Sequence, residues 1–246
     1  MERKNVRRKT LYNFIFDVDD TLYDQLEPFK RAYYENFSTN NEISIEGLYR
    51  YSRKFSDEVF EQSQQGTISM DEMHIYRLTK AFNVFDITIK PQQALAFQKD
   101  YARFQKEITL LPDMEKTLQY CKTNNVTTGI ITNGPSKHQR NKIKNLNITH
   151  WIKPEHLFIS GELKMAKPDK QIFHYVENQM KLERQQTFYI GDSYKNDMLG
   201  AKSAGWKTIW YNQRDHFITD EASEPDFIVK KTGQIYDLIE NLCNRF

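Results

Sequence analysis

The sequence predicts an α/β protein with a doubly wound, mostly parallel sheet and an inserted helical-bundle domain. After residue 109, short apolar or β-branched runs alternate with helical patterns. One further apolar run, residues 11–16, stands far upstream of them. Between these parts, residues 23–108 carry aromatic side chains at helical spacings and no strand pattern. We therefore expect a Rossmann-like core of residues 1–22 and 109–246, with a helical domain of residues 23–108 inserted into it.

The upstream run has the character of a strand buried on both faces of a parallel sheet, because its apolar residues show no clean alternation. It leads directly into Asp-Val-Asp-Asp-Thr at residues 17–21. In open α/β sheets, catalytic groups gather at the carboxyl ends of strands. Asp17 and Asp19 project on the same side of an extended chain, and two such carboxylates suit Mg²⁺. Taken alone, an acidic turn that ends a strand explains the same residues.

The inserted domain is expected to hold four helical segments, near residues 25–38, 45–65, 70–83 and 91–107. Ser69 and Glu72 have the spacing of a capping box. Pro91 lies where the first turn of a helix accepts proline. The abundant Tyr and Phe of this domain are expected mainly to pack its interior.

The remaining chain alternates helices with strands. Asp113 is expected to cap a helix that runs through Lys122, and Pro168 is expected to open another. The sequence predicts strands at residues 126–132, 156–160, 187–190, 208–211 and 226–229. It predicts helices at residues 136–146, after Pro168, up to Gly205 and at 235–242.

Polar residues follow several of these strands. Thr132 and Asn133 offer a hydroxyl, an amide and backbone N–H groups at a helix start, which is a favourable anion site. Lys167, if it lies beside a phosphate, would neutralise charge on the transferred group. Asp192 could complete the ligand set of a cation, and Asp197 could orient Lys167 or a metal-bound water. Capping turns, a solvated lysine and an ordinary turn explain these residues one by one.

Composition narrows the class of partner. The chain has 35 basic and 33 acidic residues, a balance that favours neither a nucleic-acid polymer nor a membrane. Two cysteines without a Cys-x-x-Cys motif suggest no disulfide framework or zinc site, which fits a cytoplasmic protein. No span approaches the length needed to cross a bilayer. Residues 1–9 carry five basic residues and are expected to form a solvated terminus.

Four motifs in this order and spacing are together highly specific. They are Asp-Val-Asp-Asp-Thr at 17–21, Ile-Thr-Asn-Gly at 131–134, Ala-Lys-Pro-Asp at 166–169, and Gly-Asp-Ser at 191–193 with Asn196 and Asp197. The chain resembles the haloacid dehalogenase-like hydrolase superfamily in these residues. The helical insertion after the first motif resembles the helical cap of that family.

The resemblance implies a role for each matching residue. Asp17 would be the nucleophile that becomes a phospho-aspartate, and Asp19 would protonate the leaving oxygen and later deprotonate water. Thr132 and Lys167 would hold the phosphate, with Asn133 nearby. The resemblance also implies an Mg²⁺ ion bound by the Asp17 carboxylate, the Asp19 backbone carbonyl and Asp192.

The resemblance also orders the candidate functions. The dehalogenase branch lacks an aspartate at the position of Asp19, so phosphate ester hydrolysis is favoured. Residues 129–134, 167–173 and 209–212 are similar to pyrimidine 5′-nucleotidases, whereas sugar-phosphate and phosphoglycolate phosphatases share most of the same features. A phosphotransferase or mutase stays open, as does a non-catalytic protein that binds a phosphorylated metabolite. The expected partner is a small phosphate ester, and the expected state is a monomer or homodimer.

Overall fold

The computed structural model describes residues 12–37, 43–59, 62–63, 65–216 and 224–244. The basic terminus predicted from residues 1–9 lies outside the described residues. The chain divides into two compact units, of which one combines Met1–Asp24 with Thr109–Phe246 and the other is Gln25–Ile108. We call them the core unit and the cap unit and describe each by itself.

The core unit contains a six-stranded sheet in the order β3-β2-β1-β4-β5-β6, and every neighbouring pair is parallel. The strands are β1 (Asn13–Phe16), β2 (Thr127–Thr132), β3 (Leu157–Ile159), β4 (Thr187–Gly191), β5 (Lys207–Tyr211) and β6 (Phe227–Val229). β1 lies in the middle, where Ile15 pairs with Gly129 of β2 on one side and with Tyr189 of β4 on the other. All four residues of β1 are buried, which explains why its sequence lacks polar alternation.

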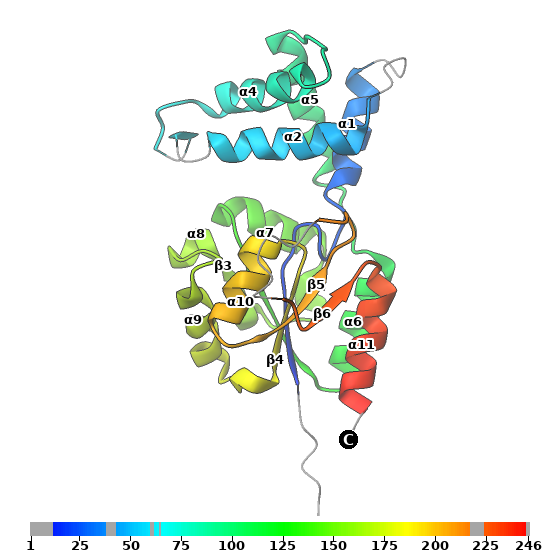
Figure 1. Ribbon diagram of the computed structural model, residues 1–246, viewed down its shortest axis with the longest axis vertical. Coiled ribbons are helices and arrows are strands. Elements are labelled where there is room, and N and C mark those ends of the chain that lie inside the picture. The colour runs from blue at the N-terminus through cyan, green and yellow to red at the C-terminus, as the bar shows by residue number, and fades with distance from the viewer. Residues whose placement is uncertain (1–11, 38–42, 60–61, 64, 217–223, 245–246) are drawn as a thin grey trace, which may run out of the picture. The chain divides into compact units, whose positions relative to one another are not determined.

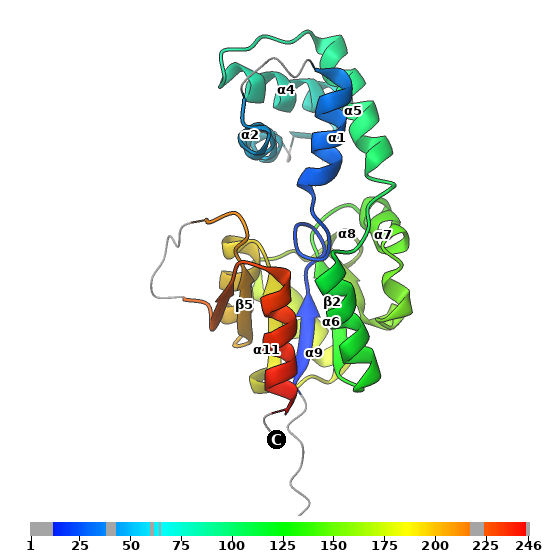
Figure 2. The ribbon, with the colours of Figure 1, turned by 90° about the vertical axis from the view of Figure 1, so that its right-hand side faces the viewer.

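Helices cover both faces of this sheet. They are α6 (Pro112–Thr123), α7 (Ser136–Asn145), α8 (Ser160–Leu163), α9 (Lys170–Met180), α10 (Gly200–Ser203) and α11 (Thr232–Asn244). α6 and α11 pack side by side on one face, and α9 lies behind the sheet in the same view (Figure 2). Phe173 of α9 and Trp206 after α10 fill the core on that second face, together with Trp210 of β5.

The cap unit is an all-helical bundle of α1 (Leu26–Asn36), α2 (Ile45–Glu58), α4 (Met70–Asn83) and α5 (Pro91–Phe104) (Figure 1). α2 packs on α4, and α1 packs on α5. Phe29, Phe82 and Phe97 are at most 1% exposed, so the aromatic residues of this unit form its interior, as predicted. The capping box is also confirmed, since Ser69 Oγ accepts from Glu72 N and Ser69 N donates to Glu72 Oε2.

Several predicted element boundaries are wrong. α6 begins at Pro112 after Leu111, so Asp113 lies inside the helix and accepts a hydrogen bond from Thr232 Oγ1 instead of capping it. Pro168 does not open α9, because Asp169 is the residue whose side chain caps that helix through Gln171 N.

Element lengths also differ from the prediction. The predicted helices at 45–65 and 91–107 end at Glu58 and Phe104, whereas the last helix is longer and spans Thr232–Asn244. The short helix before Gly205 begins as a π-helical turn, Tyr194–Leu199, and continues as α10. The strands agree with the prediction to within a residue or two at their ends.

Two features bear on the predictions from composition. Cys121 and Cys243 are free and buried, in agreement with the absence of a predicted disulfide framework. Within the described ranges, each helix is either too short or too polar to span a bilayer.

Candidate active site

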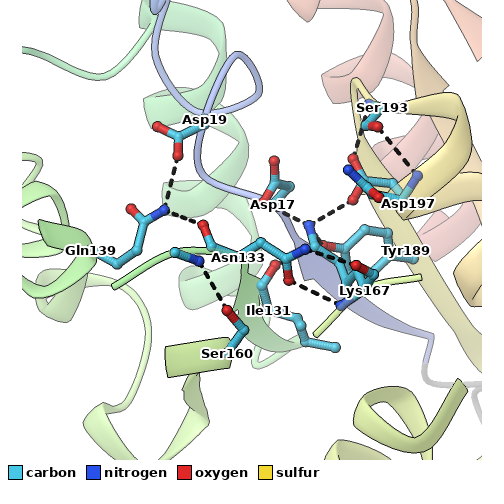
Figure 3. Close-up of polar contacts among 12 residues, drawn as sticks. Asp17, Asp19, Ile131, Asn133, Gln139, Ser160, Lys167, Tyr189, Ser193 and Asp197 are labelled. Atoms are coloured by element: carbon cyan, nitrogen blue, oxygen red, sulfur yellow. Dashed lines mark hydrogen bonds and ion pairs between the residues drawn. The ribbon is translucent and has the colours of Figure 1, made fainter. Parts of the chain in front are cut away.

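The carboxyl ends of β1, β2 and β4 bring the predicted polar residues together in the core unit. Asp17 follows β1, Thr132 ends β2, and Asp192 follows β4. Lys167 enters from the loop before α9, and Figure 3 shows its side chain beside Asp17 and Asp197. This convergence follows from the parallel sheet, since its strands all end at the same edge.

Lys167 is the centre of the cluster. Its ammonium group lies 2.8 Å from Asp17 Oδ1 and 2.6 Å from Asp197 Oδ1, and it donates to the Tyr189 hydroxyl at 2.7 Å. The Lys167 side chain is only 2% exposed, so the alternative of a solvated surface charge is wrong. Burial by itself would lower the pKa of Lys167, but Asp17 and Asp197 outweigh it and hold the pKa well above its usual range.

Asn133 fixes the loop that carries Lys167. Its side-chain amide donates to Lys167 O at 2.8 Å, and its Oδ1 accepts from Lys167 N at 3.0 Å. The Asn133 side chain was predicted to lie near the phosphate. In the structure, its amide group and its carbonyl oxygen both form hydrogen bonds with the backbone of Lys167. This pair of bonds ties the end of β2 to the start of the Lys167 loop.

Thr132 has the features of an anion-binding residue. It is 1% exposed, and its Oγ1 has no hydrogen-bond partner among the described residues. A buried hydroxyl normally has a partner, because leaving it unpaired costs about 1–3 kcal/mol. Its position at the end of β2, before the start of α7, suits a ligand that accepts hydrogen bonds, as phosphate does.

Three carboxylates lie close enough together to share a cation. Asp17, Asp192 and Asp197 each offer an oxygen, and these oxygens lie within 4.8 Å of one another. Both oxygens of Asp197 already accept hydrogen bonds, from Lys167 Nζ and from Ser193 N. This leaves Asp17 and Asp192 as the side chains better suited to bind a metal directly, while Asp197 supports them.

Burial, together with neighbouring negative charge, raises the pKa of two of these carboxyl groups. Burial raises the pKa of Asp17 to about 7, Asp197 and Asp19 add to the shift, and Lys167 opposes it. Burial, with Asp20, Asp197 and Asp17 nearby, also raises the pKa of Asp192 well above its usual range. A divalent cation between these oxygens would offset the repulsion, so the donor set fits a hard ion such as Mg²⁺.

Asp19 lies in a different environment, although it is only two residues from Asp17. Lys142 Nζ lies within 2.7 Å of both its oxygens, Gln139 Nε2 donates to Oδ2 and Tyr23 donates to Oδ1. Burial by itself would raise the pKa of Asp19, but Lys142 and these hydrogen bonds outweigh it and hold the pKa well below its usual range. The side chain of Asp19 does not belong to the three-carboxylate cluster.

A second basic residue holds the loop after β1. Arg214 follows β5 and forms ion pairs with Asp20 at 2.8 Å and Asp24 at 3.0 Å. Gln213 Nε2 donates to Asp20 O in the same place. Asp20 has a φ of 53°, in the left-handed region that residues other than glycine adopt only occasionally. Arg214 thereby stabilises the segment that presents Asp17 and Asp19.

Close approach explains the glycine at the end of β4. A Cβ on Gly191 would lie 2.2 Å from Asp197 Oδ2, so any side chain would displace that carboxylate. Glycine lets the Asp197 carboxylate lie directly against the strand end, within reach of Lys167. Packing against Asp197 thus explains the glycine of the motif at 191–193.

Sequence reasoning missed several residues that contact this site, among them Tyr23, Tyr189, Gln139, Lys142 and Arg214. Tyr189 is a buried aromatic residue in a strand, which the sequence does not distinguish from a core residue. Gln139 and Lys142 are three residues apart on α7, a spacing that places both on one side of a helix. Their only sequence signal is two polar residues on the buried face of that helix.

A model of the haloacid dehalogenase-like hydrolase family matches residues 14–211. The chain belongs to this family. The predicted resemblance and the predicted fold class are thereby confirmed. The names of its relatives give several different substrates.

Two curated relatives illustrate this range. One is glyceraldehyde 3-phosphate phosphatase of Pyrococcus furiosus, 24% identical over 92% of this chain and 91% of the relative. Another is pyrimidine 5′-nucleotidase YjjG of Escherichia coli, 32% identical over 48% of this chain and 51% of the relative.

Solved structures show the same fold for this haloacid dehalogenase-like hydrolase. The putative HAD-hydrolase YfnB from Bacillus subtilis, bound to magnesium, has a TM-score of 0.67 at 23% identity, over 93% of this chain and 98% of that chain. A dehalogenase with an intermediate complex has a TM-score of 0.71 at 18% identity, over 94% and 97% of the two chains. At these identities the similarity shows a shared fold. The substrate has to be inferred from the residues of the site.

Proposed function

We propose that this protein is a Mg²⁺-dependent phosphatase that hydrolyses a small phosphorylated metabolite through a phospho-aspartate on Asp17. The broader class, a phosphoric monoester hydrolase, is supported by the family model and by relatives named as phosphatases. The observation that carries the proposal is the placement of the buried Lys167 ammonium between Asp17 and Asp197, at the strand edge that also holds Thr132.

The residues of the site can be assigned to a two-step reaction in which atoms and charge balance. Burial raises the pKa of Asp17, whereas at Asp19 burial is outweighed by Lys142, which lowers the pKa, so these side chains by themselves favour a proton on Asp17. The reaction requires the reverse distribution, which a metal ion bound to Asp17 and a phosphate dianion beside Asp19 would favour. In the first step, an Asp17 oxygen attacks phosphorus, the bond to the ester oxygen breaks, and Asp19 gives that oxygen a proton. In the second step, water attacks the phosphoryl group and passes a proton to Asp19. The acyl phosphate bond breaks, orthophosphate leaves and Asp17 is regenerated.

Charge neutralisation decides whether a carboxylate can attack a phosphate dianion. Thr132 Oγ1 would donate to a phosphoryl oxygen. Lys167 Nζ already donates to three groups, so it would exchange its hydrogen bond to Asp17 for one to the phosphate, and its charge would offset part of the phosphate charge. A magnesium ion held by Asp17, Asp192 and the Asp19 backbone carbonyl would supply the remaining positive charge. Asp197 would keep the lysine in place, as its 2.6 Å ion pair indicates.

Asp19 separates this proposal from dehalogenation. A halide leaves without a proton, whereas an alkoxide leaving group requires one. Asp19 supplies a carboxyl group beside the nucleophile, and its side chain is 23% exposed, so it can reach a bound substrate. This feature supports phosphate ester hydrolysis although solved dehalogenases share the fold.

For the substrate class, we propose a pyrimidine nucleoside 5′-monophosphate. The 32% identity to the nucleotidase, which extends over 48% of this chain, supports this assignment. The similar stretches at residues 129–134, 167–173 and 209–212 support it as well. A small sugar phosphate is the second candidate, because the glyceraldehyde 3-phosphate phosphatase matches over nearly the full length. In both cases we propose that the helical segment 23–108 acts as a substrate-selecting cap.

Phosphate release from a panel of esters tests these assignments. The panel contains pyrimidine and purine monophosphates, glyceraldehyde 3-phosphate, other sugar phosphates and phosphoglycolate, each with Mg²⁺ and with chelator. We expect metal-dependent release that is fastest with pyrimidine monophosphates. A preference for a sugar phosphate would keep the mechanism and replace the substrate, and transfer of phosphate to an added sugar hydroxyl would indicate a phosphotransferase.

A variant pair tests the nucleophile. Asp17→Asn should abolish release, while Asp237→Asn, at an exposed position of α11 in the core unit, should leave it unchanged. Acid quenching during turnover of the wild type should trap a phosphoryl group on the peptide that contains Asp17. Full activity of Asp17→Asn, or a phosphoryl group trapped on another residue, would contradict the assignment.

A further inference from the structure

The Asp19 carboxylate is held by three side chains that lie outside the four strand-end motifs. Lys142 Nζ lies 2.6 Å from Oδ1 and 2.7 Å from Oδ2. Gln139 Nε2 donates to Oδ2 at 3.0 Å, and the Tyr23 hydroxyl donates to Oδ1 at 2.5 Å. Each carboxylate oxygen therefore accepts from two donors. Rotation of the group about its side-chain bonds would break several charge-assisted hydrogen bonds at once.

The two donors on α7 are more deeply buried than the Asp19 carboxylate that they contact. Gln139 is 1% exposed and the Lys142 side chain 4%, whereas the Asp19 side chain is 23% exposed. A lysine is almost never buried to this extent unless it is paired. In the described part of the chain, Asp19 is the one ion-pair partner of Lys142. The buried donors thus hold a carboxylate that remains open to a ligand.

The same helix connects Asp19 to the proposed phosphate site. Gln139 and Lys142 lie on α7, which follows the Thr132 strand end. Gln139 Nε2 also donates to Asn133 O at 2.5 Å, and Figure 3 shows it between that carbonyl and Asp19. Gly134 permits this approach, because a Cβ there would lie 2.8 Å from Gln139 Nε2. One glutamine therefore sets the distance between the acid and the anion-binding turn.

We propose that Lys142 and Gln139 are positioning residues that hold the Asp19 carboxyl group where it can exchange protons with the ester oxygen and then with water. The inference rests on the proposed function and adds to it residues that act through Asp19. Tyr23 completes the set from the loop that follows β1. Neither Lys142 nor Gln139 needs to contact substrate for this role.

The proposal predicts a kinetic pattern that depends on the leaving group. An alkyl phosphate needs a proton on the departing oxygen, so the first step should slow when Asp19 is misplaced. A p-nitrophenolate departs without that proton, so Asp17 should still be phosphorylated quickly. The second step needs Asp19 to take a proton from water with either substrate. With p-nitrophenyl phosphate, a misplaced Asp19 should therefore cause the phospho-enzyme to accumulate.

The test compares Lys142→Met and Gln139→Leu with wild type, with Lys142→Arg as the charge-conserving variant and Lys144→Met as the matched control. Lys144 is exposed and lies on the same helix. For Lys142→Met we expect a loss of roughly 100-fold in kcat with an alkyl phosphate and little change in KM, in line with the contribution of a placed proton donor. Gln139→Leu should show a smaller loss in the same direction. With p-nitrophenyl phosphate we expect a burst of one p-nitrophenol per enzyme, followed by slow turnover.

Partial recovery in Lys142→Arg and normal rates in Lys144→Met complete the expected result. Equal losses on both substrates, with no burst, would overturn the positioning role. Circular dichroism confirms that each variant folds. If Lys142→Met does not fold, Gln139→Leu provides the same kinetic comparison.

Thermal unfolding gives a readout that does not depend on activity. If Lys142 acts through Asp19, the loss in Tm caused by Lys142→Met should be much smaller in an Asp19→Asn background. Additive losses would overturn the pairing on which the proposal rests. A wild-type protein that releases phosphate from no ester would instead refute the proposed function, and the thermal cycle would still decide whether Lys142 is coupled to Asp19.

Discussion

Lys167 and Asp197 form an ion pair of 2.6 Å in which the lysine side chain is 2% exposed and the aspartate side chain is fully buried. The aspartate comes from the π-helical turn after β4, and the lysine comes from the loop before α9. Two segments that are distant in sequence thus hold one ammonium group at the edge of the sheet. The geometry makes the lysine dependent on Asp197 for its position.

Asp197→Asn should keep the hydrogen bond to Lys167 but remove the charge. Supporting residues of this kind typically contribute about 10–100-fold to activity, so we expect a fall of that order in kcat. Steady-state kinetics with the preferred ester measures it. An unchanged kcat would show that Asp17 and Tyr189 hold the lysine without Asp197.

Magnesium should stabilise the core unit in a way that depends on Asp192. Four aspartates, at 17, 19, 192 and 197, lie near two lysines, at 142 and 167, which leaves an excess of negative charge that a divalent cation can offset. We expect Mg²⁺ to raise the Tm of the wild type and to raise that of Asp192→Asn much less. Calcium and a chelator serve as controls, and an equal rise in both proteins would place the ion elsewhere.

Arg214→Met should loosen the loop that carries the acidic motif. The substitution leaves Asp20 and Asp24 without the guanidinium that lies 2.8 Å and 3.0 Å from them. Removing one partner of a buried ion pair costs about 3 kcal/mol, so urea unfolding should show a loss of that size. Activity should fall as well, because Asp17 and Asp19 belong to the same segment. Lys195→Met, at an exposed position, is the control.

The cap unit should lose stability in mild acid because of His74. Burial lowers the pKa of His74 to about 4 from 6.5, Arg77 adds to the shift, and its Nδ1 has no hydrogen-bond partner among the described residues. Between these two pH values the unfolded chain binds more protons than the folded chain, so the free energy of unfolding falls as the pH is lowered. We expect His74→Gln to flatten this dependence in Tm measurements from pH 7 to pH 4.5. Parallel curves for the two proteins would exclude the histidine as the cause.

The sequence was sufficient to predict the sheet and the residues at its edge, because both depend on local patterns. The β-branched run at residues 127–132 favours a strand and forms β2, and the carboxyl ends of parallel strands share one edge. The polar residues that follow these strands could therefore be grouped without coordinates. Asp17, Thr132 and Asp192 were grouped in this way, whereas Lys167 was included as a lysine at a loop-to-helix junction.

The residues that position the site's acidic side chains could not be predicted, because their role depends on contacts between segments that are distant in sequence. Lys142 and Arg214 have the sequence character of surface residues, and such residues are normally solvated. Their burial follows from the positions of Asp19 and Asp20, which lie more than a hundred residues away along the chain. The predicted start of α9 at Pro168 was wrong for a local reason. Asp169 is the residue that caps α9, so the helix begins after it.

The central position of β1 in the sheet has a consequence for the order in which the two units fold. Asn13 pairs with Thr127 and Thr187, which lie 114 and 174 residues further along the chain. The cap unit, by contrast, is formed by the continuous segment Gln25–Ile108. Local contacts form faster than distant ones, so a growing polypeptide completes its helical bundle while the strand beside Asp17 still lacks both neighbours. Asp17 therefore precedes the whole cap unit along the chain but acquires its neighbouring strands only after that unit has been synthesised.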